Sequence, residues 1–441
     1  MQGNVASTPH LRRIGRVVTI VSVAAILFAT LLPDSGERVT SHLCLICGSR
    51  GGVDVILNVL LFVPLGVGLA LLDVPAKRAI LMMCVLSVLI ETAQLFVIPG
   101  RDGTIGDVLT NTLGGTVGFA ASRNARIWLR PSPRHATILV VGWAGMWLAI
   151  QTISSFAFVP SIPESQYYGQ LAPSLGNFAV FPGRVLTASL EGIPIPNTAF
   201  DDSRDARLRL LHGATVTATV VAAETTREIA PIVRVADAEK RELVLLAQNG
   251  PDLLFAIRSG AEALRLRPPL LALPQVFAKS ALERRTIADT LAVSGRYVPR
   301  EVRMSARTAS ETHRGRIPLT ASLGWTLVLP SQWFIEGTRA EQVVSGIWVA
   351  CLMLPFGYWA PYAARPPRAQ NLAPTRIGFW LAGVAIIYGG LAVAPYAFGL
   401  TATPIREWLA ALAGILLGAG LAARVAKPVA PRGEDDQIAI R

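Results

Sequence analysis

Five polar side chains lie in or beside segments that are otherwise apolar enough to cross a lipid bilayer. They are Asn58, Glu91, Gln94, Asp107 and Asn111. Polar and ionisable groups at membrane depth are costly, so they usually face a bundle interior or a wet cavity and mark functional sites. These residues therefore define a candidate site in the first third of the chain.

Helical spacing predicts that the cluster is presented on two helix faces. Ser87, Glu91 and Gln94 are separated by four and three residues, which brings them to one side of a helix. Asp107 and Asn111 are four residues apart at the start of the next apolar segment. Two glycines continue that second face and would allow another helix to approach closely.

Two interpretations of this cluster remain open. In the functional one, Arg101, helped by Asn58 and Asn111, holds an anionic head group, because a guanidinium offers paired N–H donors to phosphate. Glu91 or Asp107 would then carry a proton or bind a divalent cation. In the structural one, the amides make interhelical hydrogen bonds and Glu91 pairs with Arg101, which closes the bundle.

Composition indicates how these residues are positioned. Hydrophobic residues make up 52% of the chain and charged residues 16%, and several apolar runs approach the roughly 20 residues that span hydrocarbon. We predict a polytopic α-helical membrane protein with eight spans. These are about Ile14–Leu32, Val53–Leu72, Ala79–Ile98, Ile105–Ala121, Ala136–Phe158, Val343–Tyr362, Ile377–Phe398 and Ile405–Ala423.

The distribution of positive charge predicts the topology. With the N-terminus in the cytoplasm, the cytoplasmic loops and tails collect 16 Lys and Arg residues, whereas the opposite short loops hold four. Both termini are therefore expected in the cytoplasm, and the long polar segment after the fifth span is expected outside. The net charge of +12 reports this topology and not a nucleic-acid partner, since residues 160–341 carry 21 basic against 18 acidic residues.

Three short motifs resemble the VanZ-like family, which is named for a protein linked to resistance to the glycopeptide antibiotic teicoplanin. The motifs are Asn58-x-x-x-Phe62-x-Pro64-Leu65-Gly66, Ser87-x-x-Ile90-Glu91-x-x-Gln94, and Arg101 with Asp107-x-x-x-Asn111-x-x-Gly114. The resemblance covers roughly residues 14–125. It implies a cell-envelope membrane protein and does not by itself assign a reaction.

Cysteine usage and the known cofactor motifs add little chemistry. Cys44 and Cys47 lie in the first outer loop, where a short disulfide is the favoured interpretation over a redox or metal role. A zinc site would need further Cys or His residues at ligand spacing, and the chain has none, so no metal site is predicted. A phosphate-binding glycine loop, a Ser/His/Asp set and a nucleotide fingerprint are also missing, so the cofactor stays unknown.

The long insertion is predicted to be an extracytoplasmic antiparallel β-sandwich. Short runs of alternating or apolar residues, separated by turn residues, recur over about residues 161–341. The expected strands lie near 207–210, 215–220, 232–235, 243–246, 253–257 and 264–267. This region resembles the concanavalin A-like or laminin G-like jelly roll, and such domains often bind glycans.

Two sets of residues in the insertion are weak ligand candidates. Asp201, Asp202 and Asp205 could hold calcium, although surface solvation is the simpler interpretation. Tyr167 and Tyr168 could stack on sugars or lie at the membrane interface.

The sequence thus divides the chain into five parts and supports three functions. The parts are a VanZ-like region (1–135), a fifth span (136–160), the β-sandwich (161–341), three further spans (342–426) and a cytoplasmic tail (427–441). The leading hypothesis is a plasma (inner) membrane protein that recognises an anionic lipid or lipid-linked glycan, with a carbohydrate-binding outer domain. The alternatives are an enzyme acting on a polyprenyl phosphate or another lipid-linked substrate, and a transporter. Candidate catalytic residues are Glu91 and Asp107, and candidate ligand-binding residues are Asn58, Gln94, Arg101 and Asn111.

The topology can be tested with reporter fusions. A reporter active only in the cytoplasm should be silent when fused near Gly250 and active near Pro367, because of the basic residues counted above. A cytoplasmic signal at Gly250 would reverse the predicted orientation of every span.

Overall fold

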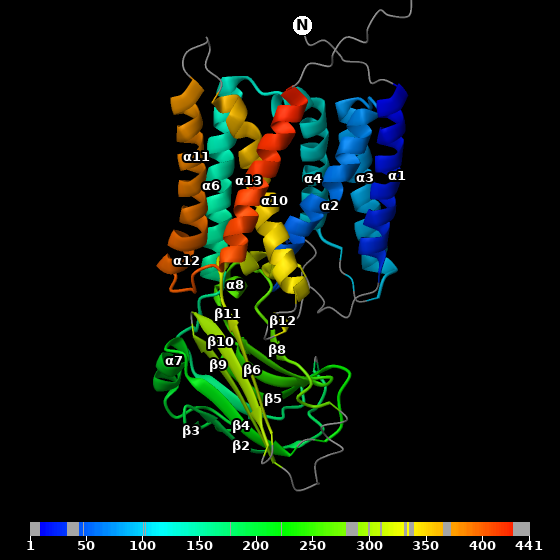
Figure 1. The fold of residues 1–441 in the computed structure, drawn as a ribbon. Coiled ribbons are helices and arrows are strands. Elements are labelled where there is room, and N and C mark those ends of the chain that lie inside the picture. The colour runs from blue at the N-terminus through cyan, green and yellow to red at the C-terminus, as the bar shows by residue number, and fades with distance from the viewer. Residues whose placement is uncertain are drawn as a thin grey trace, which may run out of the picture.

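The computed structural model describes most of the chain. It covers residues 9–32, 44–46, 48–99, 101, 103–176, 178–221, 223–278, 290–298, 300–308, 311–329, 333–334, 339–364 and 372–426. Figure 1 shows two groups of helices side by side and a β domain against one end of them.

The first helical unit contains the candidate site. Its helices are α1 (Pro9–Leu31), α2 (Gly51–Leu71), α3 (Ala76–Phe96) and α4 (Ile105–Arg123). Phe62 and Met83 are among the apolar side chains buried between these helices. α2 and α4 are pressed together at glycines, because a Cβ on Gly114 would lie 2.2 Å from the Val59 carbonyl oxygen and one on Gly118 would lie 2.0 Å from that of Val63.

The second helical unit follows a short connecting helix and surrounds its own apolar core. The connection is α5 (Ala125–Leu129), and the unit consists of α6 (Pro133–Ala157), α10 (Arg339–Ala363), α11 (Leu372–Tyr388), the π-helical η2 (Gly389–Val393), α12 (Ala394–Ala397) and α13 (Ile405–Ala426). Trp147, Phe356 and Ile415 are buried in its core. Tyr358 and Trp359 of α10 donate hydrogen bonds to the Leu129 and Trp128 carbonyls of α5, which ties the two units together at the end away from the β domain.

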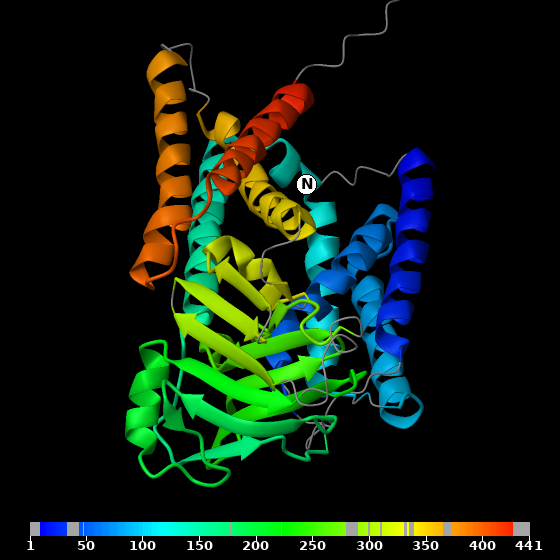
Figure 2. The ribbon, with the colours of Figure 1, turned by 60° about the horizontal axis from the view of Figure 1, so that its bottom comes forward.

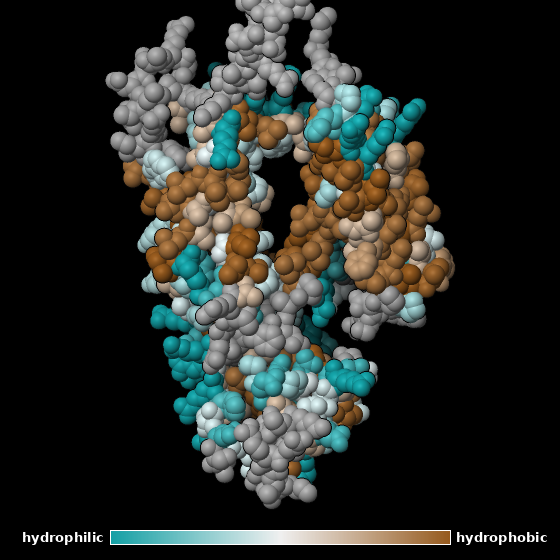
Figure 3. Space-filling model, turned by 45° about the vertical axis from the view of Figure 1, so that its right-hand side comes forward, coloured by the Kyte–Doolittle hydropathy of each residue, from teal (hydrophilic) through white to brown (hydrophobic). Residues whose placement is uncertain are grey.

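Seven helices of the described chain are long and apolar enough to cross a membrane. The fourth expected span, α4, is a helix of 19 residues but lies outside this set, because Asp107, Asn111 and its Thr and Gly residues lower its hydropathy. α4 nevertheless runs alongside α2 as a further crossing of the bundle. With this crossing included, α1 begins and α13 ends at the same end of the bundle (Figure 1). Figure 3 shows apolar surface around the middle of both units and an opening between them.

The β domain is a sandwich of two six-stranded sheets, as expected for this insertion. One sheet has the order β1 (Tyr167–Leu171), β5 (Ile229–Asp237), β6 (Glu242–Asn249), β7 (Asp252–Ile257), β8 (Leu271–Leu273), β12 (Trp333–Phe334). The other has the order β11 (Thr312–Pro318), β10 (Glu301–Arg307), β9 (Thr290–Val298), β4 (Thr215–Val221), β2 (Arg184–Leu190), β3 (Ile193–Pro194). Among the described strands, all pairings are antiparallel except that of β8 with β12.

The sandwich core follows from side-chain alternation. In β4 every second residue is buried, from Val216 to Val220, and β9 shows the same pattern. Their buried faces meet those of β6 and β7, including Leu246 and Phe255, in one apolar core. Figure 2 views the molecule from the β-domain end and shows the strands lying across the ends of the helices.

Two expected strands are wrong. Residues 207–210 belong to helix α7 (Ser203–Leu211), which is started by the Asp202 side chain accepting from the Asp205 amide and is supported by the Asp205–Arg209 ion pair. Residues 264–267 form a turn and an irregular segment after helix α8 (Gly260–Ala263). Ser259 and Glu262 form a capping box at the start of α8.

The close approach of α2 and α4 predicts a selective effect of adding one methyl group. Gly118→Ala should lower the melting temperature of the detergent-purified protein, because its Cβ would collide with backbone of α2. Gly142→Ala on the exposed face of α6 is the matched control. It has open space around it, and Ala favours a helix over Gly by about 1 kcal/mol, so its melting temperature should stay equal or rise. Equal melting temperatures for the two variants would contradict this account of the α2–α4 contact.

Candidate functional site

The candidate site lies at the end of the first helical unit that faces the β domain. Asn58 on α2 donates from Nδ2 to Oδ1 of Asp107 on α4 at 2.6 Å. The other carboxylate oxygen of Asp107 accepts from the Thr104 hydroxyl at 2.8 Å, and the Thr104 hydroxyl in turn caps α4 by accepting from the Asp107 amide at 3.1 Å. The α4 face predicted from helical spacing therefore meets α2 at Asp107.

Glu91 is buried beneath the segment that leads into α4. Its side chain is 8% exposed, and Oε2 accepts from the Thr104 amide at 3.0 Å. Gly103 passes so close that an added Cβ would lie 2.3 Å from the Glu91 carbonyl oxygen. Thr104 thus connects both carboxylates, since its amide binds Glu91 and its hydroxyl binds Asp107.

The two remaining amides of the cluster form interhelical hydrogen bonds. Gln94 donates to the Thr30 carbonyl of α1 at 2.9 Å. Asn111 donates to the Ser87 hydroxyl of α3 at 3.0 Å. The Asn111 side chain is 1% exposed, and its Oδ1 has no hydrogen-bond partner in the structure. A buried acceptor of this kind is costly unless something donates to it.

The position of Arg101 differs from the structural interpretation of the sequence, in which it pairs with Glu91. It donates from Nε to the Leu32 carbonyl at 3.1 Å and from Nη2 to the Ala29 carbonyl at 3.5 Å, so it covers the C-terminal end of α1. Glu91 and Asp107 lie within electrostatic range of its guanidinium. Glu91 and Arg101 are both described by the structure, and they do not form a direct ion pair.

Two further residues belong to the cluster and were missed at first. Asp54 lies one helical turn before Asn58 and within electrostatic range of Asp107 and Arg101. Thr104 occupies the N-cap three residues before Asp107. Both left signals in the sequence: Asp54 and Asn58 are four residues apart, and Thr-x-x-Asp before an apolar run is a helix-start pattern.

Metal and disulfide chemistry are limited in the described part of the chain. Among the described residues, no group of three or more His, Cys, Asp or Glu side chains is arranged to hold a metal ion. Cys44 is disulfide-bonded, while Cys84 and Cys351 are free. Cys47 lies outside the described residues, so its pairing with Cys44 stays a prediction.

The second helical unit carries buried polar groups that were not expected to matter. Gln151 on α6 is fully buried, and neither of its amide atoms has a hydrogen-bond partner. Glu407 on α13 is 2% exposed; its Oε1 accepts from Arg406 at 3.1 Å, whereas Oε2 has no hydrogen-bond partner. Gln and Glu in apolar spans could have been noticed from the sequence.

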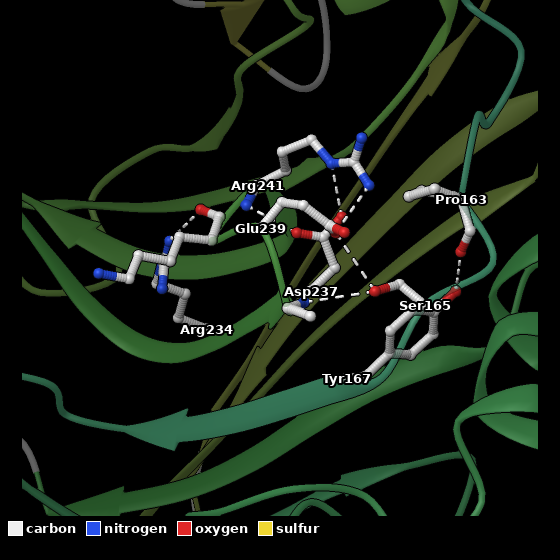
Figure 4. A network of polar contacts seen from close by, with 9 residues as sticks. Pro163, Ser165, Tyr167, Arg234, Asp237, Glu239 and Arg241 are labelled. Carbon is white, nitrogen blue, oxygen red and sulfur yellow. Dashed lines mark hydrogen bonds and ion pairs between the residues drawn. The ribbon is translucent and has the colours of Figure 1, made fainter.

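The β domain separates its candidate ligand residues. Tyr167 is buried, donates to the Pro163 carbonyl at 2.6 Å, and lies beside the ion pair of buried Asp237 with Arg241 (Figure 4). Burial raises the pKa of Tyr167 to about 12, which keeps its hydroxyl a donor. Tyr168 faces the opposite way on β1 and is exposed. Of the two tyrosines, Tyr168 alone can stack on a ligand.

The three aspartates near α7 line a pocket of about 340 Å³ together with apolar residues. Asp202 caps the helix and Asp205 pairs with Arg209, so both have structural roles. Phe200 and Asp201 complete this side of the pocket.

Comparison with known proteins addresses the first helical unit. Residues 7–128 match the family model VanZ/LLP1, and this range contains α1 to α4 and all the residues of the polar cluster. Residues 7–128 form a VanZ-like domain. No curated protein and no solved structure matches the chain. No comparison names a concanavalin A-like fold for the sandwich, so that likeness stays a prediction.

Mutation of Thr104 tests whether this residue stabilises the VanZ-like domain as the structure indicates. Thr104→Ala removes the cap of α4 and one donor to Asp107, and should cost about 1 kcal/mol of stability. Thr104→Ser keeps the hydroxyl and should stay close to wild type. Thr110→Ala on the same helix is the control, because its hydroxyl only bonds to helix carbonyls. Thermal denaturation of the purified protein measures all three, and a Thr104→Ala curve that matches Thr110→Ala would refute the capping role.

Proposed function

We propose that the VanZ-like domain recognises the anionic head group of a membrane lipid or lipid-linked glycan. The observation that carries this proposal is the gathering of three carboxylates, three side-chain amides and Arg101 toward one end of otherwise apolar helices. In the topology predicted from the basic residues, this end lies in the outer leaflet of the plasma membrane. A lipid head group would reach it there without leaving the bilayer surface.

The chemistry of the individual groups supports this assignment. Two of the five N–H groups of Arg101 are bonded to α1 carbonyls, which fixes the guanidinium while other N–H groups remain for phosphate oxygens. Asn111 Oδ1 suits a donor such as a sugar or lipid hydroxyl. Glu91 receives one backbone donor and lies apart from bulk water, which suits a group that exchanges a proton.

The β domain would bind carbohydrate outside the membrane. Its pocket combines an aromatic wall, Phe200, with the carboxylates of Asp201, Asp202 and Asp205. Carboxylates accept from sugar hydroxyls, and aromatic faces cover the apolar side of a sugar ring. A lipid-linked glycan would join the two sites, since the lipid belongs in the bundle and the glycan outside it.

A second candidate function is catalysis on a lipid-linked phosphate. Glu91 and Asp107 share Thr104 as a partner, so a proton on one affects the other. In this function Glu91 would act as a general base and Arg101 would stabilise charge on the phosphoryl group. A transporter is disfavoured, because the cluster occupies only the halves of α2, α3 and α4 that face the β domain and does not continue through the bundle.

The experiment uses full-length protein in lipid nanodiscs with a polyprenyl phosphate and the matching polyprenol. Wild-type protein should bind the phosphate more tightly than the alcohol. Arg101→Lys keeps the charge but loses the planar fork, so the dissociation constant for the phosphate should rise about 10-fold. Arg303→Lys, at an exposed position on β10 of the β domain, is the matched control and should bind like wild type.

Glu91→Gln separates structure from function in cells. Gln keeps the shape and can still accept from the Thr104 amide, so the melting temperature should stay near wild type. The variant should fail to restore the envelope phenotype of a deletion strain, whereas Glu239→Gln, at an exposed turn, should restore it. If the protein binds phosphate and alcohol equally and Glu91→Gln complements fully, the polar cluster has only a structural role in helix packing. Phosphate release from a polyprenyl pyrophosphate that Glu91→Gln abolishes would favour the enzyme.

A further inference from the structure

The first turn of α2 belongs to both domains of the protein. Val53 is fully buried and is part of the apolar core of the β-sandwich, although its helix belongs to the VanZ-like domain. The Gly52 amide donates to the Arg265 carbonyl at 3.1 Å. An added Cβ at Gly52 would lie 2.5 Å from the Leu264 carbonyl oxygen, so the backbones are in direct contact. The β domain is therefore fixed directly before Asp54 and little more than one helical turn before Asn58.

The segment of the β domain that makes this contact is itself held in place. Arg265 has a φ of +53° and donates from Nη1 to the Ile46 carbonyl, just before α2. Two residues on, the Arg267 amide donates to the Leu327 carbonyl at 3.0 Å and its Nε to the Val328 carbonyl at 3.2 Å. These bonds hold the half-buried Arg267 side chain in the segment whose backbone contacts the start of α2.

The charges at this junction oppose anion binding unless a second cation takes part. Asp54 and Asp107 lie within electrostatic range of each other, and both carboxylates would repel a phosphate at the mouth of the site. Arg267, Arg50 and Arg101 all lie within electrostatic range of Asp54. Positive charge from these guanidinium groups offsets the repulsion.

We propose that Arg267 of the β domain is a phosphate-binding residue of the VanZ-like site, so that the head group is held at the junction between Arg101 and Arg267. This inference rests on the proposed function. Asp54 attracts the Arg267 guanidinium before the ligand arrives and therefore competes with the phosphate for it. The β domain thereby determines which lipids bind, because only a ligand with an anionic group at this depth reaches both guanidinium groups.

The test measures dissociation constants for full-length protein in nanodiscs with three probes: a polyprenyl phosphate, the matching polyprenol and inorganic phosphate. Arg267→Gln should weaken polyprenyl phosphate binding about 10-fold or more, since a hydrogen bond to a charged group is lost, and should leave polyprenol binding unchanged. Arg303→Gln, also in the β domain, should bind like wild type. Asp54→Asn removes the competitor and should tighten binding of the phosphate.

The outcomes separate this inference from the proposed function. If wild-type protein prefers the phosphate and Arg267→Gln keeps that preference, the inference is overturned and the proposed function stands. If wild-type protein does not prefer the phosphate, the proposed function itself fails. Parallel loss of affinity and melting temperature in Arg267→Gln and Asp54→Asn would make the two residues a structural pair and would also overturn the inference. Inorganic phosphate that competes at the same concentration would support the Arg267 site and assign it to a soluble phosphate.

Discussion

The backbone contact between α2 and α4 is the constraint on which the VanZ-like site depends. Gly66 meets the backbone of Gly115 there as closely as Gly114 and Gly118 meet their α2 neighbours, and a side chain at Gly66, Gly114 or Gly118 would separate the helices. A 2.6 Å hydrogen bond from Asn58 to Asp107 is possible only at this interhelical distance. Asp107 then fixes Thr104, and Thr104 fixes Glu91. The polar cluster is thus a product of close packing.

The β domain is joined to this packing at the same helix. Because α2 begins inside the sandwich core with Val53 and carries Asn58 after little more than one turn, displacement of the β domain would move the donor to Asp107. At the far end, α5 contacts α10 through Tyr358 and Trp359. The VanZ-like domain is therefore held at both ends by parts of the chain that lie outside the family match.

Local spacing was enough to predict part of this arrangement. The i, i+4 relation of Asp107 to Asn111, and that of Ser87 to Glu91, correctly grouped the residues by helix face, because the helical period decides it. The partner of Arg101 could not be predicted, since the α1 carbonyls become its acceptors only after tertiary packing. Residues 207–210 alternate between polar and apolar side chains as a strand does, yet the N-cap formed by Asp202 favours a helix. Arg267 gives no signal, because its place beside Asp54 depends on how two domains dock.

The insertion of the sandwich between α6 and α10 has a consequence for biosynthesis. The VanZ-like helices emerge from the ribosome first, and domains generally fold in that order. Val53 and the Gly52 amide must then wait without their partners until Leu264 and Arg265 have been synthesised and moved to the same side of the membrane. The first turn of α2 is therefore the last part of this helix to reach its final packing, which forms only when the β-sandwich docks against it.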